Sequence, residues 1–347
     1  MPDPTQPPHH QLRVREVIRE TDEACSVVLE SPDGAAELFD YQPGQFLTLR
    51  LPGTAGDVGR CYSLCSSPHV DAAMKIAIKR IEGGIGSNWI CDSLTVGQLL
   101  DCLPPAGVFT PRSFDEDFLL FAGGSGITPV LSILKSALAV GTGQVVLMYA
   151  NQREDAVIFA AELRELAAAH PDRLHVTHWL ESVQGLPTRA QLKALAAPFT
   201  SYTSFVCGPS PFMEAVTHVL RELHVPPARI HVERFQSLAE NPFELVAPSA
   251  PVQPGGATAA LEVDLDGQTH EFAWPTQTKL LDFLLAQGLK APFSCRQGAC
   301  SACACIVSEG EVKMLNNEIL EQDDLDEGYV LACQSLPISD TVKVRYS

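Results

Sequence analysis

Four cysteines near the end of the chain have the spacing of a metal-cluster site. Cys295, Cys300 and Cys303 follow the pattern C-x4-C-x2-C, and 29 residues separate Cys303 from Cys333. This plant-type spacing predicts four thiolates that hold a [2Fe–2S] cluster, which carries one electron at a time. A zinc site or a set of buried thiols is the alternative, but zinc sites usually show two close cysteine pairs, and Cys333 stands alone. We expect Cys333 to come from a distant strand and Cys305 to be a spare thiol.

A glycine-rich segment, Phe121–Pro129, lies between a predicted strand and a predicted helix. Three glycines would let its backbone turn tightly and approach a ligand. They are Gly123, Gly124 and Gly126. We expect Thr128 to cap the helix and Pro129 to lie in its first turn, where a missing N–H costs nothing. The N–H groups at such a helix start suit a dinucleotide pyrophosphate, although a merely tight turn would use the same residues.

Two segments nearer the start of the chain suit a flat ring and a phosphate group. In Arg60-Cys-Tyr-Ser63, Tyr62 can stack on a ring, Ser63 can hydrogen-bond to it, and Arg60 can pair with a phosphate. Lys79 comes just before the glycine turn 82–88, which places a serine at a predicted helix start. Each segment is ordinary by itself. Their occurrence beside the glycine-rich segment favours a nucleotide-containing cofactor.

A Cys-Gly-Pro motif follows a later predicted strand, at Cys207, Gly208 and Pro209. Ligands bind at the carboxyl edge of open α/β sheets, so Cys207 could face a nicotinamide ring. A buried small cysteine is the common alternative.

The coenzyme that would supply this ring stays open. After the predicted strand 145–150, Arg153 suits the 2′-phosphate of NADPH, whereas Glu154 or Asp155 would accept hydrogen bonds from the free 2′-hydroxyl of NADH.

The pattern of predicted elements changes twice along the chain. Residues 11–113 predict the short strands of a small antiparallel β-barrel. Residues 114–235 alternate strands with helices, which predicts an α/β domain with a parallel sheet. The proline-rich stretch 236–258 predicts a semi-stiff linker. Residues 259–347 begin with a hairpin around Asp266-Gly267 and contain the cluster cysteines, which predicts a third domain of mixed α+β type.

Bulk properties limit the classes of function. A length of 347 residues allows two or three domains, and a net charge of −18 speaks against nucleic acid or an anionic membrane surface as a partner. No apolar run is long enough for membrane insertion. Residues 1–10 lack a charged leader and a hydrophobic region, so we expect a flexible arm rather than a secretory signal. An odd count of 11 cysteines then favours reduced thiols in the cytoplasm.

Taken in order, these motifs resemble those of the ferredoxin–NADP reductase superfamily. The matching segments are Arg60-x-Tyr62-Ser63, Gly83-Gly84-x-x-Ser87, Gly123–Pro129 and Cys207-Gly-Pro209. With the C-terminal cysteine pattern they resemble the reductase components of bacterial oxygenases, most of all those of the 3-ketosteroid 9α-hydroxylase and phenylacetyl-CoA epoxidase types. The resemblance implies FAD on the barrel, NADH or NADPH on the α/β domain, and a β-grasp ferredoxin domain. Phthalate dioxygenase-type reductases share this domain order but use FMN.

The resemblance also implies roles for single residues. The residues implied to hold the flavin ring are Arg60, Tyr62 and Ser63. Those implied to meet the FAD pyrophosphate are Gly84, Ile85 and Ser87. Those implied to line the nicotinamide path are Gly124, Thr128, Cys207 and Pro209. The aromatic ring of Phe235 would cover the flavin, unless it serves ordinary packing. The residues implied to act at the reacting atoms are Ser63, Cys207 and Glu233.

The expected activity is electron transfer between proteins. A hydride would pass from NAD(P)H to FAD, and single electrons would then pass through the cluster to a separate terminal oxygenase. In residues 259–347, 14 Asp and Glu oppose 6 Lys and Arg, a balance that suits docking to a basic patch on such an acceptor, or simply solubility. We expect a monomer. The alternatives are a redox-sensing or electron-carrying module, or a reductase of a cytochrome, without an oxygenase partner.

Overall fold

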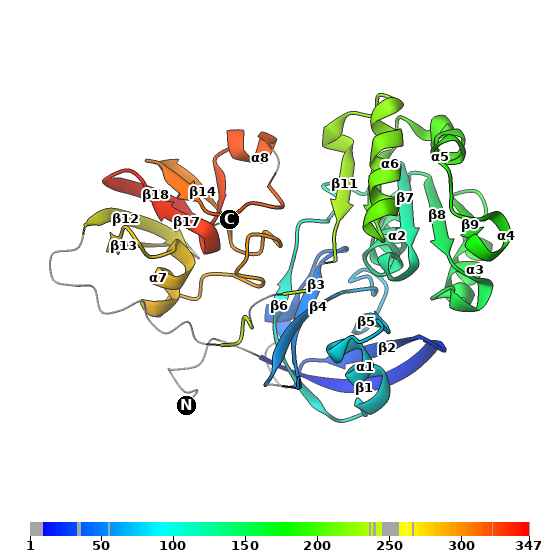
Figure 1. Ribbon diagram of the computed structural model, residues 1–347, viewed down its shortest axis with the longest axis horizontal. Helices are drawn as coiled ribbons and strands as arrows, with labels where there is room; N and C mark the ends of the chain where they lie inside the picture. Colours follow the sequence, from blue (N-terminus) through cyan, green and yellow to red (C-terminus); the bar gives the residue numbers. More distant parts are fainter. Residues whose placement is uncertain are drawn as a thin grey trace.

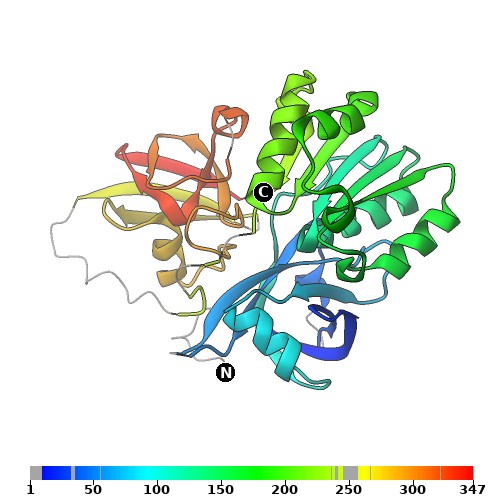
Figure 2. The ribbon, with the colours of Figure 1, turned by 45° about the vertical axis from the view of Figure 1, so that its right-hand side comes forward.

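The computed structural model contains three domains, and it describes residues 10–32, 36–54, 56–235, 237–238, 241–244, 257–265, 267–320 and 322–346. The barrel lies below the parallel-sheet domain, and the C-terminal domain stands beside both of them (Figures 1 and 2). The expected arm at residues 1–10 falls outside the described residues except for His10, which begins the first strand. The predicted turn at Asp266-Gly267 is described only at Gly267.

The first domain is the predicted antiparallel barrel. Its elements are β1 His10–Thr21, β2 Ala24–Glu30, η1 Ala36–Phe39, β3 Phe46–Leu51, β4 Val58–Ser63, β5 Met74–Lys79, α1 Ile85–Ser93 and β6 Leu99–Ala106. The strand order is β4-β3-β6-β1-β2-β5, and a bridge between Leu64 and Ile76 joins the two outer edges. Apolar side chains such as Leu12, Val27 and Leu49 fill the interior without any exposure to solvent. Burial of this inner face holds the strands in register.

The second domain is the predicted parallel sheet with helices on both faces. Its elements are β7 Phe118–Gly123, η2 Gly124–Gly126, α2 Ile127–Val140, β8 Val145–Asn151, η3 Glu154–Ala156, α3 Ala160–Ala169, β9 Leu174–Leu180, α4 Glu181–Gln184, α5 Arg189–Ala196, η4 Ala197–Phe199, β10 Thr203–Cys207, α6 Ser210–Glu222, η5 Pro227–Arg229 and β11 Ile230–Glu233. The strand order is β11-β10-β7-β8-β9. Leu120 packs with α2 and α3, whereas its neighbour Leu119 packs with α5 and α6. Because both faces are covered, the strands are continuously apolar rather than alternating.

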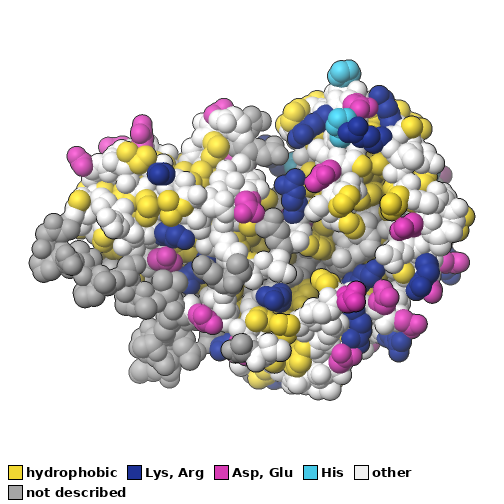
Figure 3. Space-filling model, in the orientation of Figure 1, with side chains coloured by type: hydrophobic (Ala, Val, Ile, Leu, Met, Phe, Trp, Pro, Cys, Tyr) yellow, Lys and Arg dark blue, Asp and Glu magenta, His cyan; other side chains and the backbone are white. Residues whose placement is uncertain are grey.

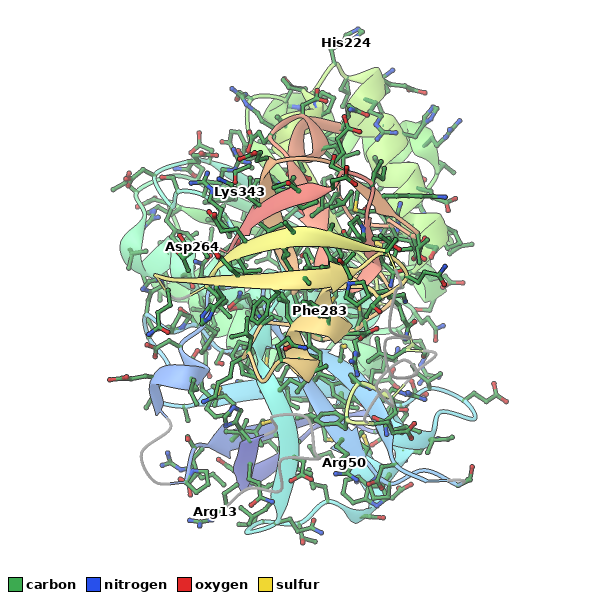
Figure 4. All side chains as sticks on the ribbon, turned by 90° about the vertical axis from the view of Figure 1, so that its left-hand side faces the viewer. Arg13, Arg50, His224, Asp264, Phe283 and Lys343 are labelled. Atoms are coloured by element: carbon green, nitrogen blue, oxygen red, sulfur yellow. The ribbon has the colours of Figure 1, made fainter. Side chains whose placement is uncertain are left out.

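The third domain is a mixed sheet with one main helix packed against it. Its elements are β12 Thr258–Leu265, β13 Gln268–Pro275, α7 Leu280–Ala286, β14 Ala304–Glu309, β15 Val312–Met314, α8 Gln322–Asp326, β16 Tyr329–Leu331, η6 Ala332–Gln334, β17 Ser335–Pro337 and β18 Thr341–Arg345. The strand order is β13-β12-β18-β14-β16, with β15 and β17 paired separately. Figure 4 looks onto this sheet, which carries Asp264 and Lys343, with Phe283 of α7 beside it and Arg50 of the barrel below. The buried Trp274, Leu280 and Leu284 form its core.

A buried lysine joins the first two domains. Lys135 of α2 is only 6% exposed, and its Nζ lies 2.7 Å from Oδ2 of Asp71 and 2.6 Å from Oε1 of Glu162. The hydroxyl of Ser132, one turn earlier, donates a 2.6 Å hydrogen bond to the backbone carbonyl of Ser66 in the barrel domain. If the domains separated, Lys135 would keep Glu162 of its own domain but lose Asp71. This ion pair and the Ser132 hydrogen bond therefore favour one relative orientation of the two domains.

Part of the predicted linker is anchored rather than extended. Phe243 is 6% exposed and packs into the core of the third domain. Asn241 donates from Nδ2 to the backbone carbonyl of Asp57 (2.9 Å), and Arg296 donates to the carbonyl of Glu244 (3.2 Å). The proline content of 236–258 predicted a spacer, but burial of one aromatic ring ties residues 241–244 to two domains. Residues 245–256 of the predicted linker lie outside the described residues.

Candidate functional site

The four predicted cluster cysteines lie together in the third domain. Cys295, Cys300 and Cys303 come from the loop between α7 and β14, and Cys333 lies in the 3-10 turn η6 rather than on a strand. This turn packs against α7, which brings Cys333 to the loop. The Sγ atoms of Cys300 and Cys333 interact with that of Cys295, and Cys333 also meets Cys303.

Backbone amides in the same loop point at these sulfurs. Gln297 and Ala299 donate N–H to the Sγ of Cys295, each over 3.4 Å, and the N–H of Cys295 points at the Sγ of Cys300 (3.3 Å). Contacts with the other thiols, led by that of Cys300, together with the Gln297 and Ala299 amides, lower the pKa of Cys295. Such donors stabilise thiolates and tune the potential of an iron–sulfur cluster. These amides belong to the loop that carries the first three cysteines.

The donor set fits a [2Fe–2S] cluster, because one loop and one neighbouring turn bring together the four thiols that its two irons share.

Arg296 holds the cysteine loop in place. Its side chain is 8% exposed, pairs with Asp282 of α7 (2.8 Å) and lies over the ring of Phe293. Gln334, next to Cys333, donates a 2.8 Å hydrogen bond to the backbone carbonyl of Arg296. Arg296 and Ser301 have positive φ angles of 59° and 53°, which the loop requires in order to turn its amides toward the sulfurs.

The predicted flavin residues gather where β4 meets α1. Gly86 allows this contact, because a Cβ there would lie 2.9 Å from Cδ1 of Leu51 and 3.0 Å from the hydroxyl of Tyr62. Arg60 and the buried Ser63 lie on the same strand as Tyr62. At the start of α1 stand the three residues predicted to meet a pyrophosphate, namely Gly84, Ile85 and Ser87. The Ser87 hydroxyl accepts the N–H of Ile81 (3.2 Å), which leaves its hydrogen able to donate to an anion.

The two predicted nicotinamide motifs meet at the carboxyl edge of the parallel sheet. A Cβ on Gly126 would lie 2.2 Å from the carbonyl oxygen of Cys207, and one on Gly123 would lie 2.8 Å from Cδ of Pro209. These glycines therefore let η2 lie directly against the segment 207–209. Lys79, at the end of β5, reaches to 4.0 Å from the position of a Cβ on Gly124, so the predicted phosphate-binding lysine stands beside the glycine turn.

The predicted capping role of Thr128 is wrong. Helix α2 begins at Ile127, its N-cap is Gly126, and the cap makes no side-chain hydrogen bond. Thr128 lies inside the first turn and donates from Oγ1 to the carbonyl of Ser125 (3.0 Å). The physical reason is that η2 runs directly into α2, so the chain is already helical before Thr128 is reached. The buried hydroxyl of Thr128 consequently braces the glycine turn instead.

Glu233 and Cys207 lie on adjacent parallel strands, paired in register. Both are affected by burial: it raises the pKa of the Cys207 thiol, and it raises the pKa of the Glu233 carboxyl to about 8. Glu233 also acts electrostatically on Cys61 of the barrel, so it lies between the two domains. The side chain of Phe235, two residues later, is half exposed.

Glu233 makes stability dependent on pH. An unfolded glutamate ionises near pH 4.3, so between about pH 4.5 and 8 the folded state retains a proton that the unfolded state has released, and stability falls as the pH rises. We expect Glu233→Gln to raise the free energy of unfolding relative to wild type, with an advantage that grows by about 2.5 kcal/mol from pH 6 to pH 8.5. Calorimetric melting at both pH values measures this. The exposed Glu165→Gln should show no such trend, and a constant difference for Glu233→Gln would contradict the assignment.

The third domain touches the barrel beside these residues. The hydroxyls of Thr48 and Ser294 share a buried 2.6 Å hydrogen bond, and Thr48 Oγ1 lies 3.4 Å from the Sγ of Cys61. Ser294 directly precedes the cluster cysteine Cys295. A cavity of about 1170 Å³ opens next to this contact and is lined by β11, by the end of β6 and by the cysteine loop, so all three domains border it.

Several of these residues carried no recognisable sequence signal. Thr48 and Ser294 are 246 positions apart, and nothing local marks a hydrogen bond between domains. Lys135 did carry a signal, because it is a charged residue inside an otherwise apolar helix. Cys61 and Cys65 form a C-x3-C pair in the sequence, and both are free thiols.

Three family descriptions match the chain in the order of its domains. An oxidoreductase FAD-binding domain matches residues 11–110, an oxidoreductase NAD-binding domain matches 120–218, and a 2Fe-2S iron-sulfur cluster binding domain matches 263–337. The ferredoxin reductase component of 3-ketosteroid-9-alpha-monooxygenase from Rhodococcus rhodochrous is 52% identical over 96% of this chain and 96% of its own length. The chain belongs to the family of oxygenase reductase components. One component of the 1,2-phenylacetyl-CoA epoxidase of Escherichia coli is also similar, with 32% identity over 97% of both chains.

Family membership establishes the cofactors and the reaction class. The chain is an oxidoreductase with FAD, NAD and [2Fe–2S] domains, and it supplies electrons to a terminal oxygenase. The chain is therefore not a redox module that lacks an oxygenase partner, which was the alternative interpretation of the sequence. Phthalate dioxygenase reductase has the same fold, with a TM-score of 0.58 at 23% identity over 97% of this chain and 98% of that one. Within the described residues, no helix has both the length and the apolar character needed to cross a bilayer.

Proposed function

We propose that this reductase serves a terminal oxygenase that hydroxylates a 3-ketosteroid. The observation that carries the proposal is the 52% identity to the 3-ketosteroid-9-alpha-monooxygenase reductase component of Rhodococcus rhodochrous over nearly the full length of both chains. Identity to the epoxidase component is 32% over a similar length. Surfaces that dock a particular oxygenase are retained more fully at the higher identity.

Reconstitution with purified oxygenases tests the partner. The reductase is mixed with NADH and either the terminal component of a 3-ketosteroid 9α-monooxygenase or the oxygenase components of phenylacetyl-CoA epoxidase. We expect hydroxylated steroid to form in proportion to the NADH consumed, and little product with the epoxidase. NADH consumption that yields only hydrogen peroxide with the steroid system, together with efficient epoxidation in the other, would assign the chain to acyl-CoA chemistry.

The site residues have proposed roles in binding and orientation. Bound FAD would accept two electrons as a hydride and release them singly, which is chemistry that belongs to the cofactors. Tyr62 and Ser63 would orient the flavin ring, and Arg60 would pair with its phosphates. The residues proposed to hold the pyrophosphate are Lys79, Gly84, Ile85 and Ser87, and those proposed to hold and orient the nicotinamide are Gly123, Gly124, Gly126, Thr128, Cys207, Gly208 and Pro209.

Two further side chains have proposed roles beside the reacting ring, one in covering it and one in holding a proton. Phe235 lies two residues after the end of β11, and its ring is half exposed, as a ring that covers the flavin would be. Glu233, with its raised pKa, would keep a proton near the reacting ring. The hydrogen bond between Thr48 and Ser294 would hold the cysteine loop against the barrel, which shortens the path from the flavin site to the cluster cysteines.

We propose NADH as the coenzyme. Arg153, the candidate for a 2′-phosphate contact, pairs with Asp155 over 2.9 Å at the end of β8. A guanidinium that is already matched by a carboxylate attracts a phosphate less strongly, and the carboxylate can accept a hydrogen bond from a 2′-hydroxyl.

Asp155→Ala should weaken this preference. Release of Arg153 is expected to raise kcat/KM for NADPH roughly fivefold and to lower it for NADH. Steady-state ferricyanide reduction with both coenzymes measures the ratio. Asp172→Ala, an exposed carboxylate at the opposite end of the sheet, is the control. A wild-type protein that already prefers NADPH, or an unchanged ratio in Asp155→Ala, would contradict the proposal.

Two further properties concern the compartment and the assembly. The structure describes all eleven cysteines and joins none of them in a disulfide, which suits the reducing cytoplasm. We propose a monomer, because the surface has a strong net negative charge that opposes self-association. Figure 3 shows that Lys, Arg and His side chains gather on the second domain near α6, whereas Asp and Glu occur on the outer part of the third domain. A partner with a basic face would approach the third domain.

A further inference from the structure

Two cysteines outside the cluster lie in contact inside the barrel domain. Cys25 comes from β2 and Cys91 from α1, 66 positions later, and their Sγ atoms are 3.3 Å apart. Helix α1 packs beside β2 and β5 at the bottom of the barrel (Figure 1). Cys25 is 6% exposed, whereas Cys91 is only partly buried. One sulfur is therefore accessible to a small solute, and the other is held behind it.

The surroundings of Cys91 favour its thiolate. Contact with the Cys25 thiol and then the charge of Arg80 lower the pKa of Cys91 to about 7, against the opposing effects of burial and of Asp92. Arg80 also pairs with Asp92, which fixes the guanidinium near Cys91. The pKa of Cys25 is raised, so it keeps its proton and donates toward Cys91. This arrangement resembles that of redox-active cysteine pairs, in which an attacking thiolate lies next to a resolving thiol.

The other cysteines outside the cluster lack this combination. Burial raises the pKa of each of them, and within the described structure none of them pairs its sulfur with that of another non-cluster cysteine. They are Cys61, Cys65, Cys102, Cys207 and Cys305. A small oxidant should therefore select Cys91.

We propose that Cys25 and Cys91 form an oxidisable dithiol that hydrogen peroxide converts to a disulfide between β2 and α1. A disulfide has an S–S length of about 2.05 Å, so the sulfurs need to approach by roughly 1.2 Å from their present 3.3 Å. A short helix on the outside of a barrel can make such a shift. Hydrogen peroxide forms whenever a reduced flavin reacts with dioxygen, so the oxidant arises where such a reductase works.

The two steps balance. The Cys91 thiolate attacks one peroxide oxygen and the O–O bond breaks, which gives a Cys91 sulfenic acid and a hydroxide that takes up a proton to become water. The Cys25 sulfur then attacks the Cys91 sulfur, the S–O bond breaks, and the departing hydroxide leaves as water with the Cys25 proton. Two thiols are oxidised by two electrons in total, and one peroxide is reduced to two waters.

The disulfide should affect the FAD site through α1. This consequence, unlike the dithiol itself, rests on the proposed roles of Gly84 and Ser87 at the start of that helix. Tyr62, proposed to orient the flavin, packs in the same core as Cys25 and Cys91. A shift of α1 toward β2 would displace these contacts, so we expect FAD to dissociate several-fold faster from the oxidised protein.

Peptide mapping tests the dithiol. The full-length holoprotein is treated with hydrogen peroxide, alkylated and digested with trypsin without reductant. Cys25 lies in the peptide 20–50, and Cys91 shares the peptide 81–112 with Cys102. We expect a reductant-sensitive cross-link between these peptides in wild type and in Cys102→Ser, and none in Cys25→Ser or Cys91→Ser. Cys25→Ser should instead retain a Cys91 sulfenic acid that dimedone labels.

The outcomes separate the two parts of the inference. Absence of the cross-link at peroxide concentrations that leave the visible absorbance of the cluster intact would overturn the dithiol, as would its persistence in Cys91→Ser. FAD release is followed by flavin fluorescence, with peroxide-treated Cys91→Ser as the control. A cross-link without faster release would support the dithiol and contradict the role proposed for the start of α1.

Discussion

We expect the Cys300→Ala variant to reduce cytochrome c roughly 100-fold more slowly than wild type, while its NADH-dependent reduction of ferricyanide stays within about twofold. Cys300 is one of four thiols whose sulfurs lie together, and the amide of Cys295 already points at it. Loss of one thiolate removes a ligand that the family's cluster requires. Ferricyanide accepts electrons before they reach the third domain, so the two activities should separate. Both rates and the visible spectrum are measured on the same preparation.

Cys305→Ala is the matched control for this experiment. Cys305 lies two residues after Cys303 and is 1% exposed in the core of the domain, but it falls outside the C-x4-C-x2-C pattern. The variant should keep the cluster absorbance and both activities, at a modest cost in stability from the small cavity. If Cys300→Ala reduced cytochrome c normally, or if Cys305→Ala lost its cluster, the ligand assignment would be wrong.

The features that the sequence predicted are those with a local signal. The glycine-rich turn, the run of three cysteines 295–303 and the alternation of strands and helices are patterns of residues close together in the sequence. Strand β8, at Val145–Asn151, extends one residue beyond its prediction. The parallel sheet followed from the alternation, because parallel strands need a crossover and the helices supply it.

The features that the sequence did not predict depend on distant residues or on exact helix starts. The hydrogen bond between Thr48 and Ser294 and the pair between Lys135 and Asp71 each require the domains to be already in place. Thr128 was a good candidate for a cap, but the preceding 3-10 turn moved the helix start to Ile127. Helix propensity describes an isolated segment, whereas here a 3-10 turn runs directly into the helix and sets its start.

Gly126→Ala should damage the proposed nicotinamide site strongly. Gly126 has ordinary helical backbone angles, φ −61° and ψ −9°, so alanine causes no backbone strain. Its Cβ would, however, lie 2.2 Å from the carbonyl oxygen of Cys207 and 2.4 Å from its carbon. Since backbone atoms cannot rotate away, η2 and the end of β10 must separate. We expect kcat/KM for NADH to fall roughly tenfold or more, with a stability loss of about 1–3 kcal/mol.

Gly143→Ala separates damage to the site from damage to the fold. A Cβ at Gly143 would lie 2.1 Å from the carbonyl oxygen of Glu116, which is a similar backbone clash, but just before β8 and β7 begin, at the opposite edge of the same sheet. We expect the two variants to melt at similarly lowered temperatures, while Gly143→Ala keeps normal NADH kinetics per folded molecule. Calorimetry and steady-state ferricyanide assays give both quantities. Equal kinetic losses in the two variants would show that η2 affects catalysis only through stability, and the nicotinamide would then have to bind away from the contact between Gly126 and Cys207.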